Sequence, residues 1–275
     1  RTMNEIPELP VADTGVRRVR HPMKLRRVQV RQVADLSPLL RRVSFGGADL
    51  QDFVTASFDD HVKLFFPLPG EQEPLLPSGP PGSRSSEGPR PVARDYTPRR
   101  FDAAAGTLDI DFLLHGHGPA ASWAAQAAPG QHLGLGGPRG SFILPEGLPW
   151  QWLIGDDAAL PAIARRLAEL PAGTPVQVLL ETRDAGTQLA LPTAAHAQIT
   201  WLHRGSAAPG TSGLLAAAVG RLAQPEGEGF VWAAGEAGEI AAVRQVLVSR
   251  WGLAKQQIRA ASYWKLREAL DPDGG

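Results

Sequence analysis

Along residues 23–146, apolar and polar side chains alternate with a period of two in several short runs. Val28 and Val30 share one face of the run 23–35, with arginine and glutamine residues around them. Further runs of this kind lie at 39–46, 61–67, 107–115 and 131–135. Such alternation is typical of half-buried antiparallel strands. With segment 94–99 as a sixth strand and an alanine-rich helix within 116–128, it predicts a small closed β-barrel.

Beyond residue 147 the pattern changes to largely apolar strands separated by helices. The strands are predicted at 150–154, 176–181, 198–203, 229–234 and 258–262, and the helices at 160–170, 213–222 and 239–251. Buried strands that alternate with helices indicate βαβ units and a parallel sheet covered on both faces. The sequence therefore predicts two domains: a six-stranded antiparallel β-barrel, then a doubly wound parallel-sheet α/β domain.

We place the limits of the barrel domain at 23–146 and those of the α/β domain at 147–270. Residues 1–22 are polar, rich in arginine and interrupted by proline, so we expect a solvated N-terminal arm. Residues 68–91 are rich in Pro, Gly, Ser and Glu and have no apolar periodicity. They predict a long surface loop, disordered around 78–88.

Composition narrows the class of protein. The 275 residues include 28 basic and 28 acidic side chains, so no strong net field attracts nucleic acid. No apolar run reaches the roughly 20 residues that a membrane span needs, and no membrane insertion is expected. Cysteine is absent, which excludes disulfides, thiolate metal sites and cysteine nucleophiles and fits a cytoplasmic location. The histidines, including His115 and His117, are not spaced to form a metal site.

Glycine and charged residues follow the predicted strands of the α/β domain. They include Gly155-Asp156-Asp157 after the first strand and Gly235-Glu236 after the fourth. In an open parallel sheet, ligands bind beyond the carboxyl ends of the strands, and glycine lets them approach the backbone. This suits a nucleotide, although the Gly-x-Gly-x-x-Gly fingerprint is missing. A structural turn explains any single glycine equally well.

The segment 94–99 has the side chains that a flavin needs. A flavin binds against a flat aromatic ring, with a hydrogen-bonding group near its reactive nitrogen and positive charge at its diphosphate. Tyr96, Thr97, Arg94 and Arg99 supply these within six residues. From composition alone, an ordinary exposed barrel strand remains an equal alternative.

The pattern Arg94-x-Tyr96-Thr97-x-Arg99 resembles the flavin motif of the siderophore-interacting protein family. These proteins are FAD-dependent ferric-siderophore reductases of the ferredoxin-NADP reductase-like superfamily. Further segments resemble the same family, at residues 59–67, 111–116, 118–120, 123–124, 137–141, 155–156, 160–163, 231–236 and 262–265. The resemblance covers roughly residues 19–266. It departs from the family at Ala121 and Ser122, where serine and then arginine are common, and in the tail after Trp264.

The resemblance implies a set of site residues. Tyr96 is expected to pack on the isoalloxazine and Thr97 to bond near its N5, as the catalytic contacts. The residues assigned to FAD or the nicotinamide are Arg94, Asp95, Tyr96, Thr97, Arg99, Asp111, Phe112, His115, Gly118, Pro119, Ala120, Ser122, Asp156, Glu236 and Trp264. For His115 and Trp264 a structural role is the alternative. Lys63, Arg139 and Lys265 are the candidates for binding an anionic ferric siderophore.

The resemblance also implies an electron path. NADPH or NADH delivers hydride to FAD, and electrons then pass to iron(III) in the siderophore, which releases iron(II). Ferredoxin is an alternative donor, and we expect a monomer. Arg183 and Arg204, after the second and third α/β strands, are candidates to bind a 2′-phosphate and so favour NADPH. The alternatives are a general NAD(P)H-flavin reductase of an electron-transfer chain and a nonenzymatic siderophore-binding flavoprotein.

Overall fold

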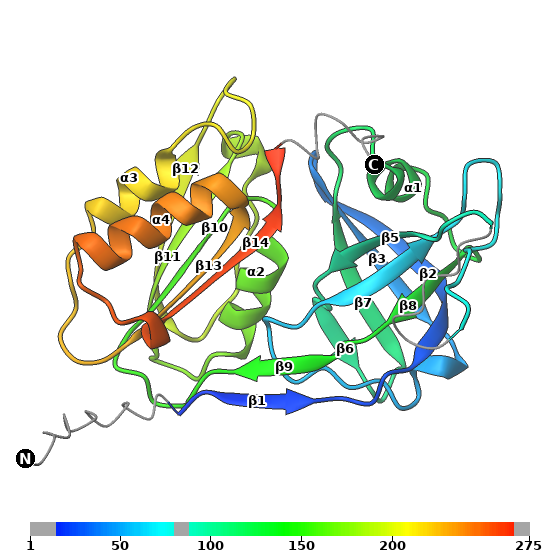
Figure 1. Ribbon diagram of the computed structural model, residues 1–275, viewed down its shortest axis with the longest axis horizontal. Helices are drawn as coiled ribbons and strands as arrows, with labels where there is room; N and C mark the ends of the chain where they lie inside the picture. The colour runs from blue at the N-terminus through cyan, green and yellow to red at the C-terminus, as the bar shows by residue number, and fades with distance from the viewer. Residues whose placement is uncertain (1–14, 80–87, 267–275) are drawn as a thin grey trace, which may run out of the picture.

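The computed structural model describes residues 15–79 and 88–266 and divides them into two lobes that lie side by side (Figure 1). Part of the loop expected to be disordered, residues 80–87, is outside the described residues. One lobe is a curved antiparallel sheet, and the other is a parallel sheet between helices. No helix in the described ranges is long and apolar enough to cross a membrane.

The barrel lobe contains a sheet of seven strands in the order β5-β4-β8-β2-β3-β7-β6. In chain order these are β2 (Leu25–Ser37), β3 (Leu40–Gly46), β4 (Val62–Phe66), β5 (Val92–Tyr96), β6 (Arg100–Asp102), β7 (Thr107–Leu113) and β8 (His132–Gly136). The sequence predicted six strands, because β6 is too short to show a periodicity. Within the described ranges no ladder joins the edge strands β5 and β6, so the barrel is open along this seam instead of closed.

Aromatic side chains fill the centre of the barrel. Val28, Val30 and Phe45 are among its fully or almost fully buried residues, as their alternation predicts. Helix α1 (Pro119–Ala125) packs Trp123 against this core, with its ring stacked on Phe45 at a centroid distance of 6.2 Å. The helix therefore covers one end of the barrel, where it contacts β3, β4, β5 and β7.

The α/β lobe is a parallel sheet in the order β12-β11-β10-β13-β14. Its strands are β10 (Gln151–Gly155), β11 (Pro175–Thr182), β12 (His196–His203), β13 (Phe230–Glu236) and β14 (Ile258–Trp264). Its helices are α2 (Leu160–Glu169), α3 (Leu214–Gly220) and α4 (Ala237–Ser249). Leu153 packs toward α2, whereas its neighbours Trp152 and Ile154 pack toward α3 and α4. This alternation confirms the doubly wound arrangement.

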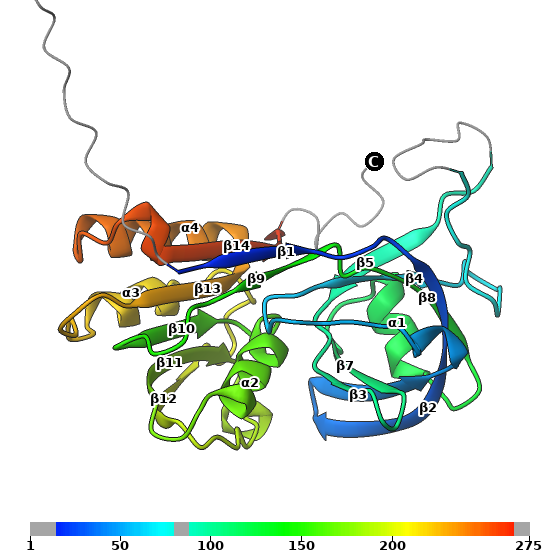
Figure 2. The ribbon, with the colours of Figure 1, turned by 90° about the horizontal axis from the view of Figure 1, so that it is seen from below.

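Strand β1 (Arg17–Arg20) was not expected, since it lies in the segment predicted to be a solvated arm. It pairs antiparallel with β9 (Gly140–Ile143), from Arg17 opposite Ile143 to Arg20 opposite Gly140. Its side chains are mostly exposed, so its polar sequence gives no sign of a strand. Backbone pairing thus fixes this part of the arm along the segment that connects the two lobes, as Figure 2 shows.

The lobes share one continuous apolar cluster. Leu40 and Phe58 of the barrel side pack with Ile163 of α2 and with Trp232 of β13. All four side chains are 2% exposed or less. Because burial of this apolar surface stabilises the contact, the two lobes are held in one relative position. Short 3₁₀ turns complete the described structure at η1 (Ala48–Leu50), η2 (Ala185–Thr187) and η3 (Lys255–Gln257).

Candidate active site

Tyr96 ends strand β5 and turns its ring toward the barrel core. The ring centroid lies 4.5 Å from that of Phe112 and 6.4 Å from that of Phe66. Burial raises the pKa of the Tyr96 phenol, an effect that the charge of Arg94 opposes. The phenol is therefore neutral at physiological pH. Phe112 is fully buried, so it supports Tyr96 from behind rather than facing a ligand.

The other residues of the motif differ in exposure. Arg94 and Asp95 face solvent, where Arg94 donates to the carbonyl of Ala93 over 2.8 Å. Lys63, on the neighbouring strand β4, donates a 2.8 Å bond to Asp95. Thr97, in contrast, is 7% exposed. Lys63, a candidate for substrate binding, and Asp95, a candidate for flavin binding, thus form an exposed ion pair.

Arg99 has one buried donor atom without a hydrogen-bond partner. Its side chain is 16% exposed, and its Nε is buried without a hydrogen-bond partner. The nearest carboxylate oxygen, Oδ2 of Asp111, is 4.0 Å away, because Asp111 already accepts bonds of 2.7 and 2.9 Å from Arg42. Burial lowers the pKa of Arg99, and Asp111 partly offsets this.

A buried cation with a free donor is a favourable site for a phosphate oxygen. The start of α1 is a second candidate: Gly118 has no side-chain cap, and a Cβ on Gly118 would meet no atom within 4 Å. Ala120 is buried, whereas Ser122 is exposed and its Oγ donates a long 3.4 Å bond to the carbonyl of His117. The donor set and the open space fit the diphosphate of a flavin dinucleotide.

Asp156 joins the carboxyl ends of three strands. Its Oδ2 accepts 2.9 Å bonds from the backbone amide of Glu236 and from Nε1 of Trp264, and its Oδ1 accepts from the amide of Ala158. Burial raises the pKa of Asp156 to about 6, although these hydrogen bonds oppose the shift. The strand order reverses between β10 and β13, where open α/β sheets bind their ligands.

Glu236 is the N-cap of α4. Its Oε2 accepts from the amides of Gly238 at 2.7 Å and Glu239 at 2.9 Å, and its Oε1 accepts from the amide of Leu266 at 3.2 Å. A carboxylate at this position satisfies amides that the helix leaves free. Asp156 and Glu236 therefore shape the crevice by holding its backbone.

A small hollow at this crevice includes residues of both lobes. The barrel contributes Leu113 and His115, and the α/β lobe contributes Asp157, Glu181, Arg204 and Trp264. The rings of His115 and Trp264 lie 6.1 Å apart. Burial lowers the pKa of His115, so its imidazole is neutral near pH 7.

The two arginines expected to bind a 2′-phosphate have carboxylate partners. Arg204 donates to Asp157 over 2.8 Å, and both side chains are less than a tenth exposed. Arg183 donates to Asp184 over 2.8 Å at the surface. In this conformation Arg204 and Asp157 form an internal ion pair in the lining of the hollow. Arg183, 43% exposed, retains access to a ligand.

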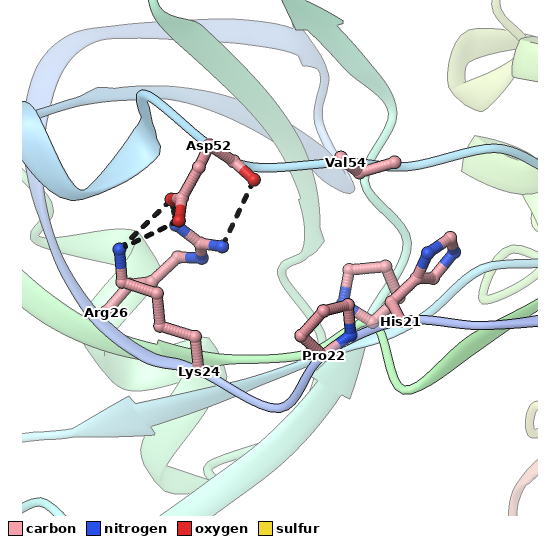
Figure 3. A pocket seen from close by; sticks show the side chains of 8 residues that line it. His21, Pro22, Lys24, Arg26, Asp52 and Val54 are labelled. Atoms are coloured by element: carbon pink, nitrogen blue, oxygen red, sulfur yellow. Dashed lines mark hydrogen bonds and ion pairs between the residues drawn. The ribbon is translucent and has the colours of Figure 1, made fainter.

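The three candidates for siderophore binding, Lys63, Arg139 and Lys265, are exposed. Lys63 of β4 stands opposite Gly136 of β8, three residues before Arg139 in the chain, and Lys265 directly follows β14. A second hollow lies near the same turn, lined by His21, Lys24, Arg26, Asp52 and Pro138 among others (Figure 3). Hydrogen bonds from Arg26 and Lys24 lower the pKa of Asp52 to about 2. This hollow thus has largely paired charges.

Sequence reasoning missed several residues that hold the motif in place. Arg42 aligns Asp111, Arg165 of α2 bonds to the carbonyl of Pro98, and Tyr263 of β14 meets the side chain of Thr97. Their partners lie 67 or more positions away in the chain, so no local pattern marks them. No group of three His, Cys, Asp or Glu side chains suited to a metal ion occurs within 15–79 and 88–266.

Comparison with known proteins gives consistent matches over both lobes. The model of a siderophore-interacting FAD-binding domain matches residues 29–142, and that of the siderophore-interacting protein matches residues 148–267. The NADPH-dependent ferric-chelate reductase of Escherichia coli (strain K12) is 34% identical over 265 residues, 95% of this chain and 99% of that protein. The ferric vibriobactin reductase ViuB of Vibrio cholerae is 34% identical over 84% of this chain and 85% of its own length.

Solved structures agree with these matches. The crystal structure of a siderophore utilization protein from T. fusca is 40% identical and has a TM-score of 0.85, over 91% of this chain and 96% of that one. The siderophore-interacting protein SipS from Aeromonas hydrophila is 28% identical, with a TM-score of 0.75 over 92% and 96% of the two chains.

Proposed function

The chain belongs to the siderophore-interacting protein family, and from this we propose that it is an NADPH-dependent, FAD-containing ferric-siderophore reductase. The observation that carries the proposal is the buried Nε of Arg99, which has no hydrogen-bond partner and follows Tyr96 and Thr97 in the chain. Bound FAD would supply the chemistry, because a flavin accepts two electrons from a nicotinamide and returns them singly to iron(III).

The flavin side of the site lies on the barrel lobe. Tyr96 provides a neutral aromatic surface, and Thr97 provides a hydroxyl at the reactive edge. Arg99 and Arg94 provide positive charge for the diphosphate, and Asp111, which Arg42 holds, lies 4.0 Å from the Nε of Arg99. The start of α1, from Gly118 to Ala120, gives the diphosphate an open approach to the backbone. We take 23–146 as the FAD unit and 147–270 as the nicotinamide unit, with 1–22 as the arm.

The nicotinamide side lies at the carboxyl ends of β10 and β13. Asp156 and Glu236 hold the backbone there, and Trp264 and His115 flank the hollow at the meeting of the lobes. Hydride transfer requires the two reacting rings to be in contact and excluded from water. The proposed donor is NADPH, as in the E. coli relative, with ferredoxin as the alternative donor. Because reduced nicotinamide is a cytoplasmic reductant, we propose that the protein acts in the cytoplasm. We also propose that it acts as a monomer.

The substrate side is a basic, exposed rim. Ferric siderophores are often anionic. Lys63, Arg139 and Lys265 are exposed, and Lys63 contacts the motif through Asp95. The Lys63–Asp95 pair is solvent-exposed on both sides, so it costs little to open. Lys63 can therefore exchange Asp95 for an anionic chelator.

The test begins with FAD binding by the purified protein. Reconstituted protein is then mixed anaerobically with NADPH, NADH or reduced ferredoxin, and iron(II) release from ferric siderophores is followed with ferrozine. Flavin bleaching by NADPH followed by siderophore-dependent reoxidation is the expected result. Failure to retain FAD would refute the proposal. Bleaching without iron release would indicate a reductase for a protein acceptor, and bound FAD that NADPH leaves oxidised would indicate a nonenzymatic flavoprotein.

A further inference from the structure

Arg165, a buried residue of α2, extends from the α/β lobe into the barrel lobe. Its side chain is 6% exposed, and its Nη1 donates 2.8 Å bonds to Oγ1 of Thr55 and to the carbonyl oxygen of Pro98. Its Nε donates to Glu169 one helical turn later. All three bonds come from a single guanidinium, so the planar group is held in one orientation.

The Pro98 bond acts directly on the flavin motif. Pro98 stands between Thr97 and Arg99, and the amide of Arg99 is already fixed by a 2.9 Å bond to the carbonyl of Asp109. Arg165 therefore holds the carbonyl of this same Pro98–Arg99 peptide, so both polar groups of the peptide are bonded, next to residues that are proposed to contact FAD. Thr55 continues the chain of bonds, since its hydroxyl donates 2.7 Å to the buried carboxylate of Asp60.

A second contact from the α/β lobe meets the same motif. Burial raises the pKa of the Tyr263 phenol, and hydrogen bonding with the Thr97 side chain partly offsets this. Tyr263 immediately precedes Trp264 at the end of β14. The Tyr263 phenol thus reaches Thr97, the residue directly after β5, from the nicotinamide lobe.

Helix α2 also starts at the other half of the site. It begins at Leu160, directly after the turn that carries Asp156 and Asp157 at the end of β10. At about 1.5 Å per residue, Arg165 lies roughly 8 Å along the axis from that start. One rigid helix therefore connects the nicotinamide crevice with the flavin motif.

Building on the proposed function, we propose that Arg165 is a positioning residue for hydride transfer: it sets the Thr97–Arg99 backbone relative to the nicotinamide crevice. It does not touch either cofactor. Its removal should loosen the motif and slow transfer between correctly bound partners, while the affinity for NADPH, which depends on the crevice, is retained.

The first experiment needs no flavin. Hydrogen–deuterium exchange in the segment 92–102 is compared among the FAD-free parent, Arg165→Met and Arg166→Met. Arg166 is the matched control, because this half-buried arginine of the same helix donates instead to Gln151 of its own lobe. We expect faster exchange in this segment for Arg165→Met alone. Equal exchange in all three proteins would overturn the proposal.

The second experiment separates rate from binding. With FAD bound, the limiting rate of flavin reduction at saturating NADPH should fall about 10- to 100-fold in Arg165→Met, since small misplacements of reacting groups have effects of this size. The NADPH dissociation constant should stay within about twofold of the parent value. Arg165→Lys should recover part of the rate by donating to one of the two acceptors. A parental limiting rate in Arg165→Met, or an equal loss in Arg166→Met, would contradict the inference.

A further variant covers the case in which Arg165→Met does not fold. Thr55→Val removes one acceptor from the barrel side and should give smaller changes in the same direction, whereas parental exchange and rate would refute the role. These experiments distinguish a failure of the role of Arg165 from a failure of the proposed function. If the parent fails to bind FAD or to be reduced by NADPH, the proposed function is wrong, while the exchange experiment still decides whether Arg165 holds the motif.

Discussion

The indole Nε1 of Trp232, in β13, donates a 2.9 Å hydrogen bond to Oδ1 of Asp59, which lies just before β4 of the barrel. Oδ2 of the same carboxylate accepts a 3.1 Å bond from Arg259 of β14. Trp232 is fully buried and Asp59 is 7% exposed. One carboxylate of the barrel lobe therefore satisfies donors on two strands of the α/β lobe.

Replacing Asp59 with alanine should weaken this interface. The change leaves the buried indole N–H without an acceptor and Arg259 without its partner, so the free energy of unfolding should fall by about 2 kcal/mol. Urea denaturation measures the loss. Asp102→Ala is the control, because Asp102 is a surface residue that accepts a 3.0 Å bond from the exposed amide of Ala105 and pairs with Arg100 at 3.7 Å. A comparable loss there would argue against a special role for Asp59.

Arg99→Met should have opposite effects on stability and on cofactor binding. Without a ligand, the substitution removes a buried cation whose Nε has no partner, so the FAD-free protein should be stabilised by about 1 kcal/mol. With FAD, it removes a charge-assisted bond and should weaken affinity about 10- to 100-fold. Thermal unfolding and flavin fluorescence titration measure the two effects.

The neighbouring Arg100 is the control for Arg99. Its side chain is 68% exposed, and Arg100→Met should change neither quantity appreciably. Parental FAD affinity in Arg99→Met would remove Arg99 from the proposed flavin site.

The pH dependence of stability should include a contribution from Asp156. Burial raises its pKa in the folded protein to about 6, above its ordinary value of 3.8. The folded state thus holds the proton more tightly than the unfolded state does. The contribution is fully present below about pH 4 and is lost as the pH rises to about 6, with a total of up to about 3 kcal/mol.

Asp156→Asn should abolish this component while lowering stability overall, because an amide cannot accept all the bonds that the carboxylate accepts. The measurement is the difference in unfolding free energy between parent and variant at several pH values. Asp35→Asn provides a contrast, since a hydrogen bond from Arg41 lowers the pKa of Asp35 and its contribution is lost as the pH falls. A parent–variant difference that does not change between pH 4 and 6 would contradict the assignment.

Gly235→Ala should disturb the crevice. Gly235 has a φ of +156°, and a Cβ there would lie 2.7 Å from Oδ2 of Asp156. The substitution should lower the free energy of unfolding by about 1–3 kcal/mol and slow flavin reduction by NADPH. Gly220→Ala, where the added Cβ meets only Val246 at 3.9 Å, should instead stabilise α3 by up to about 1 kcal/mol. Equal stability of the two variants would show that the close approach at Gly235 is relieved at no cost.

Much of the fold was predictable because burial leaves a periodic trace in the sequence. The alternation around Val28 and Val30 and the apolar run at Leu153 each identified a strand, and the two-domain fold and family resemblance are confirmed. Strand β6 and the open seam were missed, because three residues cannot show a period and pairing between edge strands has no local signature. Strand β1 was missed because its stabilisation comes from backbone bonds and not from burial.

The candidate site was predictable in its residue types but not in its partnerships. The Tyr96–Arg99 motif has a recognisable composition, whereas the pairing of Asp111 with Arg42 depends on a register between β3 and β7. Likewise, Arg204 follows a strand end as a phosphate-binding residue would, yet Asp157, 47 positions earlier, pairs with it. Charged residues at strand ends are thus visible in the sequence, but their partners are set by the assembled sheet.

The pairing of β1 with β9 means that the two lobes are not interchangeable modules. The connecting strand is bound along its length by the N-terminal one, and Phe142 within it lies under both Arg18 and Arg259, at 5.3 and 4.9 Å from the ring centroid. A chimera that joins this barrel to another reductase's nicotinamide domain must therefore carry the N-terminal strand and a matching arginine with it.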